Sequence, residues 1–327
     1  MSTLLLVSCA ATAWFQRSIR LLYIKNKIMP SLSYYIVTTV LRIKGLKKIF
    51  AQDPIPYEKL RKEDIHIPSK RVLKGNASTQ FKVLNTLVTS LVPKKYNNDQ
   101  FLLLYCPGGA FVSGPNLLSW DSLAKLVRNT GINAWMLDYP KAPEAKILET
   151  TQNIDAVYAK ALEQYDASRI ILIGDSAGGN LILTLTQRLI AKQQPLPRRL
   201  IAISPAFDGS MTNPEIDRVD PYDCMLSKKG VLSAKRMCQG NLDIKDPMLS
   251  PLYGSFKNFP PVDLFMGEYD VLYPDQKLGR AKMEQEGVDL NVTIGKKMPH
   301  IWPLLPVMKE GVNALKKIEK IILQQIK

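Results

Sequence analysis

The sequence predicts an α/β fold, with a mostly parallel twisted sheet, helices on both faces and a small cap. Three observations support this prediction. From about residue 62 onward, short apolar runs alternate with helix-length amphipathic stretches, a pattern typical of parallel strands joined by helices. The strand candidates are continuously apolar, as in a sheet buried on both sides. Residues 206–256 interrupt the alternation with four prolines and mixed charges, which indicates an inserted cap.

The expected elements follow one another in chain order. The run FLLLY at 101–105 predicts the first buried strand, and a glycine turn follows it. A helix at 120–129, a strand at 132–137 and a helix at 148–165 come next. In the last of these, Ile154, Val157 and Ala161 share one face. The run RIILI predicts a strand at 169–173, before a helix at 181–192. Further strands are expected at 200–204, 262–266 and 290–294, helices at 276–286 and 310–326, and a short edge strand at 64–67.

The composition is that of a globular protein. The chain has 327 residues, of which 46% are hydrophobic and 22% are charged, so disordered, collagen-like and disulfide-scaffold classes are excluded. Four cysteines without a CxxC pair and only two histidines, His66 and His300, argue against a zinc ribbon or a poly-histidine site. We therefore expect neither a metal nor a cofactor.

Positive charge is concentrated at the amino terminus. The net charge is +15, and residues 1–50 contain eight Lys or Arg residues and no acid. These cations alternate with aromatic and aliphatic residues, which predicts basic amphipathic helices suited to an anionic membrane surface. The alternative is a solvated lead-in helix that packs on the main domain. No recognition motif accompanies the charge, so we expect no nucleic-acid partner. The expected division is a basic segment at 1–55, partly cap, and a main domain at 56–327.

No membrane span is expected, because the uncharged stretches 1–16 and 28–41 fall short of about 20 apolar residues. The lesser alternative is a secretory signal or a lipoprotein box ending at Cys9, since no positive residue precedes the short apolar region. We expect a cytoplasmic protein, with peripheral membrane binding as an option. The true start is either Met1 or Met29.

The segment Gly174-Asp175-Ser176-Ala177-Gly178-Gly179 fits G-x-S-x-G and lies between a predicted strand and a predicted helix. That context is the one a nucleophile elbow requires. Bulky residues at Gly174 or Gly178 would collide with the strand or the helix, because the turn is tight. Ser176 is therefore the candidate nucleophile. It stands at a helix amino terminus, where the Ala177 N–H and the helix dipole face a developing oxyanion.

A serine nucleophile needs a base and an acid, in the chain order Ser, acid, His. Only His300 follows Ser176, so it is the candidate base, whereas His66 is expected to be structural. Asp270 follows the strand at 262–266 and is the candidate acid that holds the His300 tautomer. Glu268 and Asp275 are the fallback acids.

These residues resemble the hormone-sensitive-lipase-like branch of the α/β-hydrolases, in particular bacterial acetyl-hydrolases and small esterases. Matching segments occur in the family's order: PGGAF at 107–111, DYPKAPE at 138–144, GDSAGG at 174–179, DPMLSPL at 246–252, GEYDVLYPD at 267–275 and MPHIWP at 298–303. The resemblance covers the chain from about residue 60 to the end. It implies the α/β-hydrolase fold and a cap formed by amino-terminal helices together with an insertion.

The resemblance also implies roles for individual residues. Ser176, Asp270 and His300 match the triad, and Gly108, Gly109, Ala110 and Ala177 match the donors of the oxyanion hole. One departure is Pro107, which stands where the family has a histidine. A second is Pro140-Lys141, where the family usually has Arg-Leu.

The function predicted on these grounds is cofactor-independent hydrolysis of carboxylic esters with short to medium acyl chains. The mechanism is acyl transfer to Ser176, followed by attack of water activated by His300. Amide or lactone hydrolysis on the same triad is the alternative enzyme. A non-catalytic, membrane-peripheral binding protein is the alternative from another class, and Pro107 is the residue that favours it.

Overall fold

The computed structural model describes residues 29–95 and 98–326. Its centre is an eight-stranded sheet with the order β1-β2-β4-β3-β5-β6-β7-β8. The β1–β2 and β2–β4 pairs are antiparallel, and all other neighbouring strands are parallel. The predicted fold class is therefore confirmed.

The strands are β1 Ala77–Val83, β2 Thr86–Val92, β3 Asn98–Cys106, β4 Ile132–Asp138, β5 Ile170–Asp175, β6 Arg199–Ile203, β7 Val262–Gly267 and β8 Leu290–Gly295. The longer helices are α2 Leu32–Lys44, α5 Leu117–Thr130, α6 Ile147–Leu162, α7 Ala177–Ala191, α9 Lys228–Gln239, α10 Tyr273–Gln285 and α11 Lys309–Gln325. The short helices are α3 Leu46–Phe50, α4 Tyr57–Arg61 and α8 Ile216–Val219.

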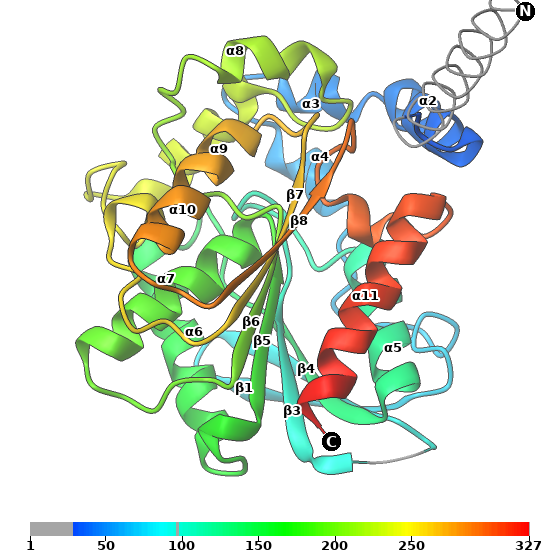
Figure 1. Ribbon diagram of the computed structural model, residues 1–327, viewed down its shortest axis with the longest axis vertical. Helices are drawn as coiled ribbons and strands as arrows, with labels where there is room; N and C mark the ends of the chain where they lie inside the picture. Colours follow the sequence, from blue (N-terminus) through cyan, green and yellow to red (C-terminus); the bar gives the residue numbers. More distant parts are fainter. Residues whose placement is uncertain (1–28, 96–97, 327) are drawn as a thin grey trace, which may run out of the picture.

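Helices cover both faces of the sheet, with α5 and α11 on one face and α6, α7 and α10 on the other (Figure 1). Every residue of β5 and β7 is buried, because the core lies on both sides of these strands. This arrangement accounts for the continuously apolar runs in the sequence.

The register of the parallel strands brings their carboxyl ends level. Cys106 of β3 pairs with Gly174 of β5, and Asp175 pairs with Ile203 of β6. Further along the sheet, the last residue of β7 pairs with the last residue of β8. The segments that follow β3, β5, β7 and β8 therefore leave the sheet on the same side, at the carboxyl ends of the strands, and the predicted site residues lie there.

Two expectations about local structure were wrong. Residues 64–67 form no strand; Ile65 instead donates its N–H to Pro115 O at 2.8 Å, and its carbonyl accepts the Trp120 indole N–H at 2.8 Å. The edge strands of the sheet are β1 and β8. Helix α7 begins at Ala177, four residues before the expected start, because the Gly178-Gly179 pair is accommodated within its first turn.

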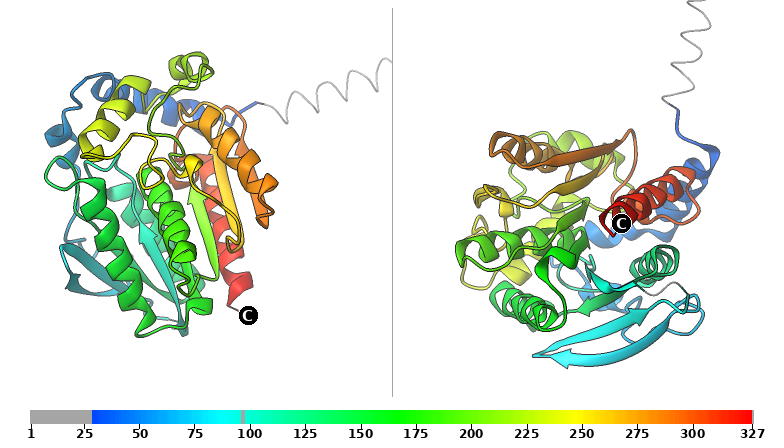
Figure 2. Two further views of the ribbon diagram at one scale, coloured as in Figure 1. Left: turned by 90° about the vertical axis from the view of Figure 1, so that its left-hand side faces the viewer. Right: turned by 60° about the horizontal axis from the view of Figure 1, so that its bottom comes forward.

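The amino-terminal helices pack on the inserted segment 206–256. The Ile55 N–H donates to Ser233 Oγ at 2.9 Å, and Lys47 Nζ donates to Asp223 O at 3.1 Å. Figure 1 and the left view of Figure 2 show the amino-terminal helices, together with α8 and α9 of the inserted segment, at the top of the molecule, beyond the carboxyl ends of the strands. We infer from these contacts that the two segments form one cap.

Helices α2 and α3 agree with the amphipathic helices expected in the basic segment. The expectations for residues 1–28, including the box ending at Cys9 and the choice between Met1 and Met29, lie outside the described residues. Within 29–95 and 98–326, no helix is both long and apolar enough to cross a bilayer.

Candidate active site

Ser176 occupies the turn between β5 and α7. Its backbone has φ 54° and ψ −118°, a conformation that side-chain-bearing residues rarely adopt. The Ser176 N–H donates to Ile203 O at 2.9 Å, which fixes the turn against β6. A Cβ on Gly174 would overlap the backbone of Gly178, and one on Gly178 would overlap the backbone of Cys106. The glycines are therefore required by the closeness of the strands and helix, as the sequence predicted.

His300 and Asp270 form a buried pair. His300 Nδ1 lies 2.9 Å from Asp270 Oδ2, and the side chains are 4% and 0% exposed. Asp270 also accepts the Leu272 N–H at 2.9 Å and the Gln276 amide at 3.1 Å, so its orientation is fixed by several donors. A Cβ on Gly267 would lie 2.6 Å from Met298 O. Glycine at this position thus allows the histidine loop to approach the acid loop.

Electrostatic attraction raises the pKa of His300 above its ordinary value. Burial by itself lowers that pKa, because it disfavours the charged imidazolium. The opposing contributions are the charge and hydrogen bond of Asp270, followed by the charges of Asp223 and Asp175. The net environment favours an imidazolium, the species that a general base forms during acyl transfer.

Asp223 is a second buried carboxylate near this pair, and sequence reasoning did not identify it. It accepts the backbone N–H groups of Met225 at 2.7 Å, Leu226 at 2.9 Å and Val271 at 2.8 Å. Burial and the neighbouring Asp270 charge raise the pKa of Asp223 to about 6. The cap insertion carries no periodic pattern or motif around Asp223, so the sequence held no signal for its role.

The two fallback acids, Glu268 and Asp275, and the other histidine, His66, have partners outside the Asp270–His300 pair. Glu268 accepts the Lys297 N–H at 2.9 Å, and Asp275 accepts the Asn213 amide at 3.0 Å. Neither carboxylate hydrogen-bonds to His300 in the described chain. His66 is exposed and pairs with Asp138 at 2.5 Å, and it does not line the cavity described below.

The glycine turn after β3 lies beside the serine turn. Gly109 and Ala110 have φ values of 128° and 55°, and their N–H groups donate to no acceptor in the described chain. The Gly108 N–H differs, because it lies near the buried Asp175 carboxylate and opposes the rise in the pKa of that group that burial causes. Pro107 has no N–H, and its carbonyl accepts the Tyr139 hydroxyl at 2.8 Å. The unoccupied donors are therefore those of Gly109, Ala110 and Ala177, the last of these at the first position of α7.

These groups face one cavity of about 540 Å³. Ser176, His300 and the four predicted oxyanion-hole residues all line it. Asp270 lies behind His300 and does not line it. Ser176 Oγ makes no hydrogen bond to His300 in the described chain, and such bonds often tighten only when substrate binds. The remaining walls include residues of α2, α3, α5 and α9.

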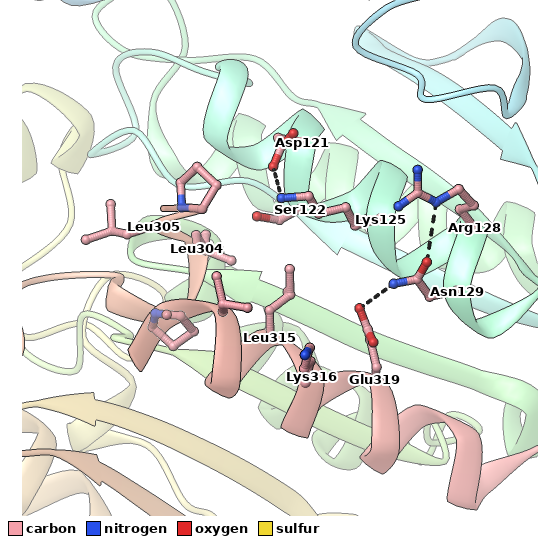
Figure 3. Close-up of a pocket in the computed structure, with 14 residues that line it drawn as sticks. Asp121, Ser122, Lys125, Arg128, Asn129, Leu304, Leu305, Leu315, Lys316 and Glu319 are labelled. Atoms are coloured by element: carbon pink, nitrogen blue, oxygen red, sulfur yellow. Dashed lines mark hydrogen bonds and ion pairs between the residues drawn. The ribbon is translucent and has the colours of Figure 1, made fainter. Parts of the chain in front are cut away.

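A second cavity of about 180 Å³ lies between α5 and α11 (Figure 3). Its lining includes Asp121, Lys125, Arg128, Asn129, Lys316 and Glu319. The Asn129 amide donates to Glu319 at 2.8 Å across it. None of the predicted site residues lines this cavity, although Leu305 and Pro306 line both cavities.

Comparisons with known proteins agree with this fold. A family model described as the α/β hydrolase fold matches residues 103–304. An esterase of Acinetobacter venetianus is 32% identical over 58% of this chain and 63% of its own length. A triacylglycerol lipase of Mycobacterium tuberculosis is 26% identical over 61% of this chain and 41% of its own length. These two matches thus span less than two thirds of either relative.

One solved structure is that of an esterase from the bacterial hormone-sensitive lipase family. It is 26% identical, with a TM-score of 0.80, and the match covers 92% of this chain and 100% of that chain. The protein belongs to the α/β hydrolase fold family, and its resemblance to the hormone-sensitive-lipase-like branch is confirmed.

Proposed function

We propose that this protein hydrolyses carboxylic esters, with Ser176 as nucleophile, His300 as general base and Asp270 as the acid that orients His300. The observation that carries the proposal is the buried Asp270–His300 pair, which backs the cavity that Ser176 lines. The names of similar proteins, an esterase and a triacylglycerol lipase, support the same chemistry.

The proposed reaction has two steps. Ser176 Oγ attacks the ester carbonyl while His300 takes its proton, and the N–H groups of Gly109, Ala110 and Ala177 stabilise the oxyanion. The alcohol leaves with the proton from His300, and an acyl-serine remains. Water then attacks the acyl carbon as His300 accepts a proton, which returns to Ser176 when the carboxylic acid is released.

The proposed substrates are esters with short to medium acyl chains. The cavity volume of about 540 Å³ lies within the range of ordinary small-molecule sites. Amides and lactones are the alternative substrates, because the same triad attacks any activated acyl carbon. A panel of p-nitrophenyl acetate, butyrate and octanoate, compared with a p-nitroanilide and a γ-lactone, distinguishes these classes.

Fluorophosphonate labelling with peptide mapping tests the nucleophile directly. The expected result is one label, on Ser176, together with hydrolysis of p-nitrophenyl butyrate. Ser176→Ala should abolish both, with a loss of roughly 10⁴-fold or more in kcat, and its melting temperature should stay near that of the wild type. Turnover by Ser176→Ala at a rate comparable to the wild type contradicts the assignment. An unlabelled, inactive wild type supports the non-catalytic alternative.

We also propose that the α2 face docks on an anionic membrane. Four apolar residues with helical spacing, Leu32, Ile36, Val40 and Ile43, are 77%, 56%, 46% and 79% exposed. Ile36 and Val40 also line the cavity, so the apolar face continues to the cavity mouth. Arg42, Lys44 and Lys48 are exposed beside it, and residues 29–50 contain no acid. Apolar and basic groups side by side suit an interface of acyl chains and anionic headgroups.

Vesicle co-sedimentation tests the membrane proposal. Binding is expected to phosphatidylcholine vesicles that contain phosphatidylglycerol, and it should weaken with salt, because surface charges are screened. The double variant Leu32→Asp, Ile43→Asp should lose binding. The double variant Ile67→Asp, Leu84→Asp is the matched control, because it adds the same charge at two apolar residues outside α2 that are 77% and 64% exposed. Equal sedimentation of the double variant and the wild type overturns this role of α2.

A further inference from the structure

Lys235 of α9 is a buried cation in the wall of the candidate active-site cavity. Its side chain lines the cavity, although the residue is only 2% exposed. Its Nζ donates to Leu249 O at 2.6 Å and lies 4.5 Å from the centroid of the Phe111 ring. An ammonium group has three N–H donors. One of them is used by Leu249, and no other hydrogen-bond acceptor of the described chain takes the remaining two.

Lys235 makes no salt bridge with a carboxylate of the described chain. Among the lysines and arginines of residues 29–95 and 98–326, Lys235 alone falls among the fully buried side chains. The titratable groups that face it are Cys238 on its own helix and Asp208 on the segment after β6. Asp208 is already held by the Ser210 and Tyr253 hydroxyls, each at 2.8 Å. Burial lowers the pKa of Lys235 to about 8, so at neutral pH the amine is still mostly protonated.

Hydrogen bonds connect Lys235 to the turn that carries the nucleophile. Leu249 O also accepts the Asn180 side-chain amide at 2.7 Å. The Asn180 backbone N–H in turn donates to Ser176 O at 3.1 Å. On the other side, Phe111 directly follows the glycine turn. The ammonium group therefore lies near the first turn of α7 and the glycine turn, and Lys235 lines the same cavity as Ser176.

We propose that Lys235 binds a carboxylate carried by the substrate, so that this site prefers esters bearing a second, anionic group. The neighbouring cavity wall is apolar, with Phe111, Val231 and Ala234, and an anion placed there gains a charge-assisted hydrogen bond in a poorly hydrated setting. This inference rests on the proposed ester hydrolysis and names its substrate class. A half-ester of a dicarboxylic acid is the simplest member of that class.

A matched pair of substrates tests the acyl side. Mono-p-nitrophenyl glutarate and p-nitrophenyl valerate have acyl chains of the same length, and they differ in the terminal carboxylate. The readout is the ratio of their kcat/KM values for the full-length protein. We expect the wild type to favour the glutarate half-ester by roughly 10- to 100-fold, the range of one hydrogen bond to a charged group. The corresponding alcohol-side pair is 4-acetoxybenzoate and 4-methylphenyl acetate.

Two variants separate recognition of charge from a structural role. Lys235→Met keeps the length of the side chain without its charge and should reduce the ratio to about one or below, mainly through KM. Lys235→Arg should retain most of the preference. If Lys235 had only a structural role, Lys235→Met would damage the cap and lower kcat/KM for both esters of a pair. The ratio of the two values would then stay unchanged.

The wild type alone provides an independent check. The preference for the anionic ester should fall as pH rises through about 8, where the Lys235 amine loses its proton. Titration of His300 affects both esters and cancels in the ratio. A wild type without a preference on either pair, or a preference that Lys235→Met retains, overturns the inference. If p-nitrophenyl valerate and 4-methylphenyl acetate are not hydrolysed at all, the proposed ester hydrolysis itself fails.

Discussion

Asp223 Oδ2 accepts the backbone N–H of Val271 at 2.8 Å. Asp223 belongs to the cap insertion, and Val271 directly follows Asp270, the proposed acid. This bond therefore joins the cap to the loop that orients His300. It also brings a third carboxylate, beside those of Asp270 and Asp175, close enough to raise the pKa of His300.

Asp223→Asn should move the acid limb of the pH profile of kcat/KM to lower pH. Removing the Asp223 charge weakens the stabilisation of the imidazolium, so the pKa of His300 falls and the neutral base persists to lower pH. Asp217→Asn is the control, because Asp217 is exposed and pairs with Lys228 at the surface. An acid limb that stays in place or moves to higher pH contradicts the role given to Asp223. Thermal melts of both variants show whether folding is also affected.

In the wild type, activity should fall on the acid side with a midpoint above 6.5. His300 must be neutral to act as a base, and its pKa is raised from that ordinary value, so protonation inactivates the enzyme at a higher pH than for an unperturbed histidine. The pH dependence of kcat/KM for p-nitrophenyl butyrate measures the midpoint. His300→Gln should be inactive and His66→Gln should be active; the opposite result would reassign the base.

Gly109→Val should lower kcat/KM at least 100-fold, the loss that follows removal of one oxyanion donor. A Cβ on Gly109 would overlap the Ser113 backbone, and its φ of 128° disfavours a branched residue. Gly287→Val is the matched control for backbone strain, since Gly287 also has positive φ but a Cβ there meets nothing within 4 Å. Equal activity of the two variants would exclude a special requirement at Gly109.

Pro107→His should change kcat/KM by less than about tenfold, because Pro107 has no N–H to contribute and the other donors are unaffected. Its carbonyl, which accepts the Tyr139 hydroxyl, is present with either residue. Steady-state kinetics on p-nitrophenyl butyrate provide the comparison. An inactive wild type that Pro107→His activates would instead indicate a degenerate hydrolase.

Gly230→Ala should destabilise the fold by about 1–3 kcal/mol, the usual cost of overpacking. A Cβ on Gly230 would lie 2.6 Å from the Phe50 carbonyl carbon, where α9 packs on α3. Alanine is the better helix former by about 1 kcal/mol, so a rise in melting temperature would show that this contact adjusts easily. Lys229→Ala, at an exposed position of the same helix, should stay within about 0.5 kcal/mol of the wild type.

The central sheet and the serine turn could be predicted from sequence because their constraints are local. Continuous apolar runs identify strands buried on both faces, and the glycines around Ser176 report close backbone contacts. The pairing of His300 with Asp270 followed from chain order and the positions of strand ends. The strand expected at 64–67 was wrong because its apolar residues serve different contacts: Ile65 packs beside Trp120, and Ile67 is 77% exposed.

Other features depend on contacts that no local pattern encodes. Strand β1, with the sequence ASTQFKV, is mostly exposed and has no apolar run. Asp223 and Lys235 belong to an insertion rich in prolines and charges, where a buried acid or amine looks like any surface residue. Their burial depends on how the insertion folds over the carboxyl ends of the strands. Only the tertiary structure reveals them.

The walls of the cavity and the reacting groups are carried by different parts of the chain. The proposed triad stands on the ends of β5, β7 and β8, whereas much of the wall comes from α2, α3 and α9. Mutations of the wall residues on α2 and α3 are therefore expected to alter which molecules enter without moving the serine, histidine or aspartate. Homologues with this arrangement can change their substrate specificity while the chemistry of ester hydrolysis stays the same. Exchanging residues 29–50 between such proteins would use the same separation to engineer specificity.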